Sequence, residues 1–196
     1  MGRSRARVEC DNLQHLSAKG LAPRVLAYGQ NRHWGMQNLS FLVIEEVPDT
    51  MTLDTFIAGP LQSLTPRQRR DLLRKLAVFT QTMNAGGYVN SEYHWRNILV
   101  QKSEDGVGFQ VIDPSGSRLR YKLRYPYFDL ATLDVCAPFF FSRTERLRFF
   151  KQYQGCSEEK LTSHLKKKVL AILTLRGKIA KKELKRYRKI LPNHRL

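Results

Sequence analysis

The chain has 196 residues, of which 42% are hydrophobic and 26% are charged. It is long enough for one ordinary domain with a buried core, and its composition excludes wholesale disorder, a collagen-like fibre and a disulfide-stabilised miniprotein. The charge is unusual, because 34 lysines and arginines stand against 17 aspartates and glutamates, a net charge of +17. Such a field favours anionic partners, among them nucleic acid, phospholipid headgroups and phosphorylated glycans.

The cysteines and the hydropathy pattern indicate the compartment. Three cysteines without a Cys-x-x-Cys pair predict neither a disulfide framework nor a zinc site, and they favour a reducing environment. Residues 1–7 are basic but no apolar stretch follows them, so we expect no export signal. The most apolar segment, residues 130–141, contains Asp134 and Pro138 and is shorter than the roughly 20 residues of a spanning helix. We therefore expect a chain that is soluble or bound at a membrane surface.

Hydrophobic periodicity and turn signals predict the secondary structure. In chain order, we expect a helix over residues 5–19, strands over 24–28 and 39–45 with a polar turn over 29–37, a short helix over 53–58, a long helix from 65 to 86, strands over 98–101 and 109–112 with a charged turn over 102–108, and helices over 128–139, 142–153 and 158–191. The long helix has the clearest start, because Thr65 can cap it, Pro66 suits its first turn and Gln68 can complete a capping box.

The last predicted helix is strongly basic. From Lys166 to Leu196 there are twelve lysines or arginines against one acid, Glu183. An apolar stripe runs along it, made of Leu165, Val169, Ile172, Leu173, Ile179, Leu184, Tyr187 and Leu191. The stripe is expected to pack on the core, and the lysines form either a solvated face or a surface for an anionic membrane.

Three polar residues follow an order that suits phosphoryl transfer. Glu92 lies in the loop after the long helix, Asn97 opens a strand five residues later, and Asp113 closes the paired strand. An amide and a carboxylate are hard oxygen ligands that can hold Mg²⁺ against nucleotide phosphates, and the other carboxylate can accept the proton of an acceptor hydroxyl.

On these residues the sequence resembles the protein-kinase-like superfamily, whose catalytic loop reads His-Arg-Asp-x-x-x-x-Asn and whose metal loop reads Asp-Phe-Gly. Within it, the chain is similar to the lipopolysaccharide kinases of the Kdo kinase and heptose kinase (InaA-like) family. The similar phrases are Asn-Leu-Gln-His-Leu at residues 12–16, Ala-Pro at 22–23, Tyr-His-Trp-Arg-Asn-Ile-Leu-Val at 93–100, Phe-Asp-Leu-Ala-Thr-Leu at 128–133 and Ser-Arg-Thr-Glu-Arg-Leu-Arg-Phe at 142–149.

The resemblance implies an α+β protein-kinase-like fold, with a truncated N-lobe over residues 1–47 and a mainly α-helical C-lobe over residues 48–196. It implies ATP-dependent phosphorylation of a sugar hydroxyl in lipid A or the inner core of lipopolysaccharide, with ATP and Mg²⁺ as cofactors. The expected partners are lipopolysaccharide or another anionic glycolipid and a peripheral anionic membrane surface, with no nucleic acid. The expected location is the cytoplasm, at the inner membrane.

The resemblance also assigns roles to residues. Glu92 would be the catalytic base, Asn97 a metal ligand and Asp113 the chelator of phosphate-bound Mg²⁺. The nucleotide site would include Glu9, as the acid that pairs an ATP-anchoring lysine, together with Glu46 and Val47. Asp129 would brace the catalytic loop through its backbone.

The sequence departs from the family pattern at three points. Glu92 stands where the family has Asp, and Asn90 where it has His. The anchoring lysine and a glycine-rich loop are expected upstream of Glu9, where only eight residues precede it. Either the gene model starts too late, or a partner supplies the missing part, or the chain is a pseudokinase or scaffolding module without turnover.

Each site residue also has an ordinary structural interpretation. Asp113 could be a turn residue, Asn97 a loop amide and Glu92 a solvated carboxylate. A nucleic-acid-binding protein could use the basic helix for phosphate contacts, but it would leave Asn97 and Asp113 unexplained.

Overall fold

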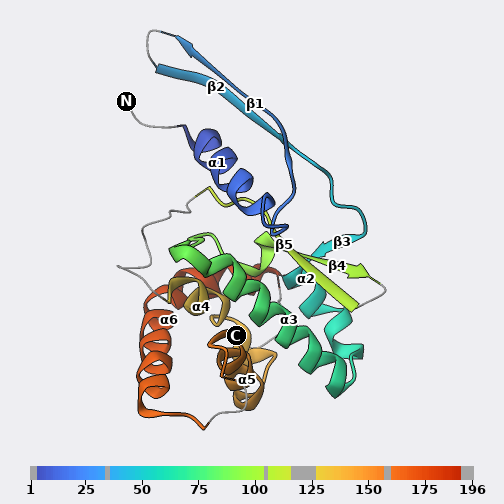
Figure 1. Cartoon of the computed structure of the whole chain (residues 1–196), viewed down its shortest axis with the longest axis vertical. Helices are drawn as coiled ribbons and strands as arrows, with labels where there is room; N and C mark the ends of the chain where they lie inside the picture. The colour runs from blue at the N-terminus through green and yellow to red at the C-terminus, as the bar shows by residue number, and fades with distance from the viewer. Residues whose placement is uncertain (1–3, 34–35, 104–105, 116–126, 157–159, 191–196) are drawn as a thin grey trace.

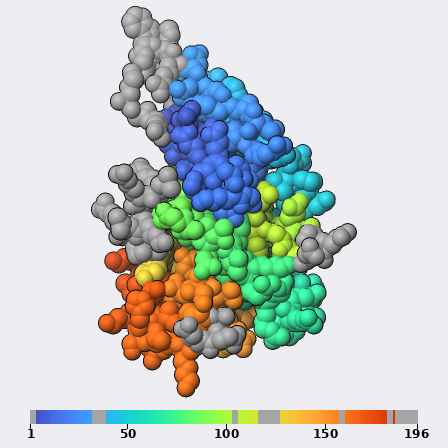
Figure 2. All heavy atoms as spheres, in the orientation of Figure 1, coloured from blue at the N-terminus to red at the C-terminus, as the bar shows by residue number. Residues whose placement is uncertain are grey.

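The computed structural model describes residues 4–33, 36–103, 106–115, 127–156 and 160–190. The helices are α1 (Arg5–Ser17), α2 (Leu53–Ala58), α3 (Pro66–Asn84), α4 (Phe128–Leu133), α5 (Arg143–Tyr153) and α6 (Ser163–Ile190). The strands are β1 (Val25–His33), β2 (Met36–Ile44), β3 (Thr50–Thr52), β4 (Ile98–Ser103) and β5 (Gly106–Val111). Figure 1 shows α1 and the β1–β2 hairpin at one end of the molecule and the larger helices at the other, with β3, β4 and β5 between them. The same order from blue to red is visible on the surface in Figure 2.

The first helix is confirmed. Ser4 Oγ caps α1 by accepting a hydrogen bond from the Arg7 N–H at 3.0 Å. The turn after the helix ends at Gly20, whose φ of +69° lies in the left-handed region that glycine adopts without steric cost. Leu13 and Leu16 are completely buried, so α1 is anchored in the main core.

The β1–β2 hairpin is longer than the sequence predicted. Its antiparallel pairing continues from Val25↔Ile44 to His33↔Met36, so much of the polar stretch expected as a turn is strand. The ladder hydrogen bonds join backbone groups, and the pairing therefore extends through residues of low strand propensity. Gly29 lies opposite Phe41, and a Cβ at this position would overlap the Phe41 ring.

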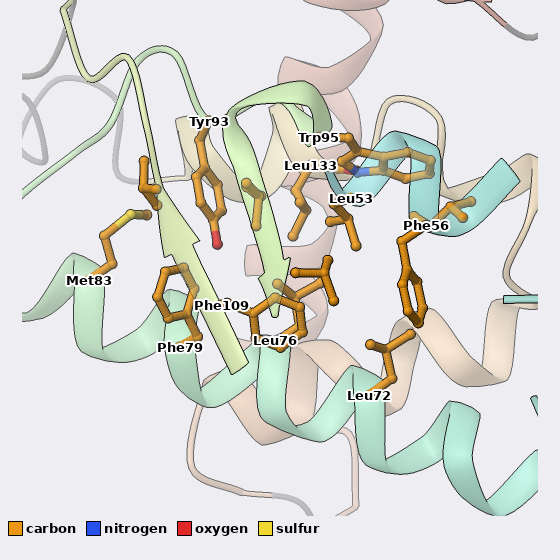
Figure 3. Packing of buried hydrophobic residues seen from close by; sticks show 14 of the residues in the cluster. Leu53, Phe56, Leu72, Leu76, Phe79, Met83, Tyr93, Trp95, Phe109 and Leu133 are labelled. Carbon is orange, nitrogen blue, oxygen red and sulfur yellow. The ribbon is translucent and has the colours of Figure 1, made fainter. Parts of the chain in front are cut away.

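The second sheet has the order β3-β4-β5 and is antiparallel throughout. Residues 102, 103 and 106–108, expected as turn, belong to the strands, for the same reason as in the first hairpin. Figure 3 shows side chains of α2 and α3 packed against this sheet, with Phe79 of α3 beside Phe109 of β5. This packing anchors β4 and β5, near whose ends the catalytic residues are expected, in the main core.

The long helix α3 begins as its capping box predicted. Thr65 Oγ1 accepts a hydrogen bond from the Gln68 N–H, and Gln68 Oε1 accepts one from the Thr65 N–H. Its buried face consists of Leu72, Leu73, Leu76, Ala77, Phe79, Thr80, Met83 and Asn84. Burying each large apolar side chain of this face stabilises the fold by roughly 1.5–3 kcal/mol.

The helix expected over residues 128–139 is interrupted. The helix α4 ends at Leu133, and a separate 3-10 helix covers Ala137–Phe139. A helix continuing through this segment would lack the hydrogen bond to the Asp134 carbonyl, because Pro138 has no N–H. Trp95 is buried, whereas Phe139 is 39% exposed.

The last two helices, α5 and α6, pack on α3 and α4 respectively. Ser142 and Glu145 form a capping box at the start of α5, confirming the predicted helix. The predicted last helix starts later than expected, at Ser163, where Thr162 Oγ1 accepts a hydrogen bond from the Leu165 N–H; residues 157–159 and 191 lie outside the described residues. A second small core joins α4, α5 and α6 and contains Leu130, Ala131, Phe150, Leu165 and Ile172.

Among the described residues, no helix combines the length and the apolar character that a membrane span requires. The division of the chain at residue 47 stays a prediction.

Candidate active site

The loop from Asn90 to Asn97 is closed on itself by hydrogen bonds. The Asn97 side-chain Nδ2 donates to the Glu92 carbonyl at 2.9 Å, and the Glu92 N–H donates to Asn90 Oδ1 at 3.1 Å. The Tyr93 and Asn97 N–H groups donate to the carbonyls of Asn90 and His94. Asn97 and Asn90 therefore fix the backbone on both sides of Glu92.

A buried carboxylate on α4 holds the start of this loop. Asp129 is 3% exposed, and its Oδ2 accepts hydrogen bonds from the Asn90 N–H at 2.9 Å and from Asn84 Nδ2 at 2.7 Å. Burial raises the pKa of Asp129 to about 7, although both hydrogen bonds act to lower it. The bond to the Asn90 N–H confirms that Asp129 braces the loop through its backbone.

The β4–β5 hairpin brings Asn97 and Asp113 to one end of the sheet. Ile98 pairs with Val111, and the Ile112 N–H donates to the Asn97 carbonyl at 2.9 Å. Asp113 follows with a φ of +50°, in a left-handed conformation that costs a non-glycine residue free energy and that recurs at functional sites.

The segment after Asp113 is tied to the first helix. Asn12 Nδ2 donates to the Pro114 carbonyl at 2.8 Å. Arg5 on the same helix donates to Ser115 Oγ at 3.0 Å. The expected metal loop therefore lies against α1. The contact is distant in sequence, since Asn12 and Pro114 are 102 positions apart.

The Glu92 carboxylate lies between two basic side chains. Its Oε2 is 3.5 Å from His94 Nε2 and 3.9 Å from the Arg96 guanidinium, and the side chain is one-third exposed. A carboxylate that is fixed by its backbone and still reaches solvent can meet a hydroxyl of an incoming substrate.

Glu9 lies close enough to Asp113 for the two carboxyl groups to interact electrostatically. Burial raises the pKa of Glu9 above its ordinary value, the negative charge of Asp113 raises it further, and Arg5 acts in the opposite direction. Glu46 and Val47 lie in the connection between β2 and β3, where the Val47 carbonyl accepts a hydrogen bond from Thr50 Oγ1. Their assignment to the nucleotide site stays a prediction.

The residues present fit a phosphate-borne Mg²⁺ ion. The described residues contain no group of three or more His, Cys, Asp or Glu side chains that could hold a metal. Mg²⁺ in phosphotransferases is usually held by one or two protein ligands together with substrate phosphates and water. The Asp113 carboxylate and the Asn97 amide oxygen, at one end of the hairpin, supply the required donor types.

Sequence reasoning missed four residues that support this site. Asn84 and Asn12 bind Asp129 and the Pro114 carbonyl, and Arg96 and Arg5 flank the two carboxylates. Arg96 and Asn12 lie inside phrases that carry the family resemblance, and that position was a usable signal. Asn84 and Arg5 act on residues more than forty positions away, for which a single sequence carries no pattern.

The comparisons with known proteins agree with the geometry. The model of the Lipopolysaccharide kinase (Kdo/WaaP) family matches residues 1–153. A solved structure described as "WaaP in complex with acyl carrier protein" is similar with a TM-score of 0.73 and 25% sequence identity, over 90% of this chain and 76% of that chain. No curated protein matches. The α+β kinase-like fold is thereby confirmed. The chain belongs to the lipopolysaccharide kinase (Kdo/WaaP) family, and the function that these matches support is that of a kinase for sugars of the lipopolysaccharide core.

Proposed function

We propose that this chain transfers the γ-phosphoryl group of ATP to a hydroxyl of a lipopolysaccharide core sugar. Glu92, Asn97 and Asp113 are its proposed catalytic and metal-binding residues. The observation that carries the proposal is the hydrogen bond from the Ile112 N–H to the Asn97 carbonyl, which sets the loop of Glu92 beside Asp113. This bond supports a single site that would contain the base, the amide and the second carboxylate.

Each residue has one task. Glu92 orients the sugar hydroxyl and accepts its proton as the oxygen bonds to the γ-phosphorus and the bond to the β-phosphate oxygen breaks, leaving ADP. Asn97 Oδ1 and the Asp113 carboxylate would hold Mg²⁺. When bound, MgATP supplies the phosphoryl group and a cation that offsets the charge of the phosphates. Glu9, Glu46 and Val47 complete the proposed nucleotide site.

Nucleotide binding tests the assignment of Asp113. Calorimetric titration with ATP, with and without Mg²⁺, should give Mg²⁺-dependent binding that weakens at least tenfold in Asp113→Asn. Asp49→Asn is the matched control, because Asp49 is the other described non-glycine residue with a positive φ and lies in the turn before β3. Unchanged affinity in Asp113→Asn would contradict the assignment.

We also propose an anionic membrane surface as a partner, on the basis of the net charge of +17 and of the basic helix α6. Ile172 is buried in the second core and Val169 is partly buried against it, whereas Lys166 and Lys167 are exposed. Binding to phospholipid vesicles should require anionic headgroups and weaken with salt. Equal binding to neutral vesicles, or a preference for duplex DNA, would contradict this partner.

The relative solved with acyl carrier protein suggests a further partner, and we propose that this chain binds an acylated carrier protein. The helical part contains a largely apolar cavity of about 850 Å³ that is lined by Leu73, Leu133, Phe141, Leu147, Ile172 and other residues. Arg143, Arg146 and Arg176 also line it. Titration should show tighter binding of the acylated than of the unacylated carrier protein. Equal affinity would leave the cavity without a role in this interaction.

A further inference from the structure

The first turn of α1 carries two arginines and no acid. Positive charge near a helix N-terminus is unfavourable, because the unpaired N–H groups there carry partial positive charge. The charge of Arg7 is offset within the helix by the Asp11 carboxylate, which lies 2.9 Å from the Arg7 guanidinium. The charge of Arg5 is offset outside the helix, because its side chain extends to the loop after β5.

Arg5 contacts this loop at two points. Its guanidinium donates to Ser115 Oγ at 3.0 Å and lies 3.8 Å from Asp113 Oδ1. The side chain is 76% exposed, so most of its surface faces solvent beside Asp113. A guanidinium has five N–H donors in a planar fork, and these two contacts use only part of that capacity.

The negative charges of Glu9 and Asp113 favour a cation beside them. Glu9 and Asp113 are close enough that the charge of Asp113 raises the pKa of Glu9, and Arg5 is the basic residue that opposes this effect. A nucleotide held at Asp113 brings several further negative charges to the same place. A planar guanidinium matches the oxygens of a phosphate group, with which it can form paired hydrogen bonds.

We propose that Arg5 is a phosphate-binding residue, which contacts the β- or γ-phosphate of the nucleotide held at Asp113. The proposal rests on the proposed function, because it takes the nucleotide site at Asp113 as given. In this arrangement Arg5 adjusts from its contact with Ser115 to the phosphate oxygens, and α1 contributes directly to nucleotide affinity.

The test is a titration of the full chain with MgATP and with adenosine, which lacks phosphates. Arg5→Met should weaken MgATP binding about tenfold or more, as expected for the loss of charge-assisted hydrogen bonds, and should leave adenosine binding unchanged. Arg5→Lys should restore part of the affinity for MgATP. Arg7→Met is the matched control, since it removes the same charge from the same turn, and it should change the affinity less than twofold.

The outcomes separate this proposal from the proposed function. If Arg5→Met binds MgATP like the wild type while Asp113→Asn does not, Arg5 has no phosphate role and the nucleotide site stands. An equal loss in Arg7→Met would show a general effect of charge and would also overturn the role of Arg5. If the wild type binds no MgATP, the proposed function fails and the role of Arg5 fails with it. Thermal unfolding of each variant checks that the fold is retained.

Discussion

Asp129 on α4 accepts a hydrogen bond from the backbone N–H of Asn90, 39 residues earlier, at 2.9 Å. The contact uses the backbone of Asn90, so the brace does not depend on which side chain stands at this position. Where the resemblance leads us to expect His, the Asn90 side chain has its own task, since its Oδ1 accepts a hydrogen bond from the Glu92 N–H. An Asn at this position is therefore compatible with an ordered loop.

The buried carboxyl of Asp129 should make stability depend on pH. Its pKa is raised from an ordinary 3.8 to about 7, so the folded state holds the proton more tightly than the unfolded chain does. The stability that protonated Asp129 contributes is fully present below about pH 4 and is lost as the pH rises through about 7. Urea unfolding from about pH 5 to about pH 8 should show the wild type losing stability relative to Asp129→Asn, which cannot titrate there.

Asp49→Asn serves as the control for this experiment, because it makes the same chemical change at an exposed aspartate. A difference between wild type and Asp129→Asn that stays constant over the whole range would contradict the raised pKa.

Asp134 joins three helices through ion pairs. Its two carboxylate oxygens accept hydrogen bonds from Arg146 at 2.7 Å each, and Oδ2 also accepts one from Arg176 at 2.9 Å. Asp134→Ala leaves both arginines without this partner, and we expect a loss of about 2 kcal/mol of unfolding free energy. The matched control is Asp71→Ala, whose pairs with Arg74 and Lys75 are more exposed and should contribute less than about 1 kcal/mol. Equal losses in chemical denaturation would contradict the structural role of Asp134.

Asn97 should affect both stability and nucleotide binding. Asn97→Ala removes the donor to the Glu92 carbonyl, at a cost of about 1–2 kcal/mol, together with the amide oxygen assigned to Mg²⁺. Gln101→Ala is the control, since its amide makes a comparable but exposed bond to the Pro48 carbonyl from the same hairpin. Calorimetry should show weaker Mg²⁺-dependent ATP binding in Asn97→Ala and unchanged binding in Gln101→Ala. Retained binding in a destabilised Asn97→Ala protein would restrict the residue to a structural role.

The parts of the fold that the sequence predicted are those with local causes. The capping boxes at Thr65 and Ser142 lie within four residues, and the periodic apolar face of α3 is continuous along the chain. The order of Glu92, Asn97 and Asp113 could be predicted because all three lie close along the chain: Glu92 is five residues before Asn97, and a short hairpin joins Asn97 to Asp113.

The parts that the sequence did not predict have partners far along the chain. The extension of β1 to His33 depends on cross-strand pairing with β2. The contact of Arg5 with Ser115 spans 110 positions, and the ion pairs of Asp134 come from two later helices. The end of α4 differs, because it had a local signal in Pro138, which lies within the segment expected as helix over residues 128–139.

Phosphate transfer tests the central claim most directly. The full chain is incubated with labelled ATP, Mg²⁺ and a lipopolysaccharide core glycolipid, and label in the glycolipid is measured for the wild type, Glu92→Gln and Glu92→Asp. We expect transfer by the wild type, a fall in kcat of roughly 10²-fold or more in Glu92→Gln, which keeps the shape but removes the base, and measurable turnover in Glu92→Asp. A wild-type chain that binds MgATP and transfers no label to the glycolipid would contradict the claim and identify a pseudokinase.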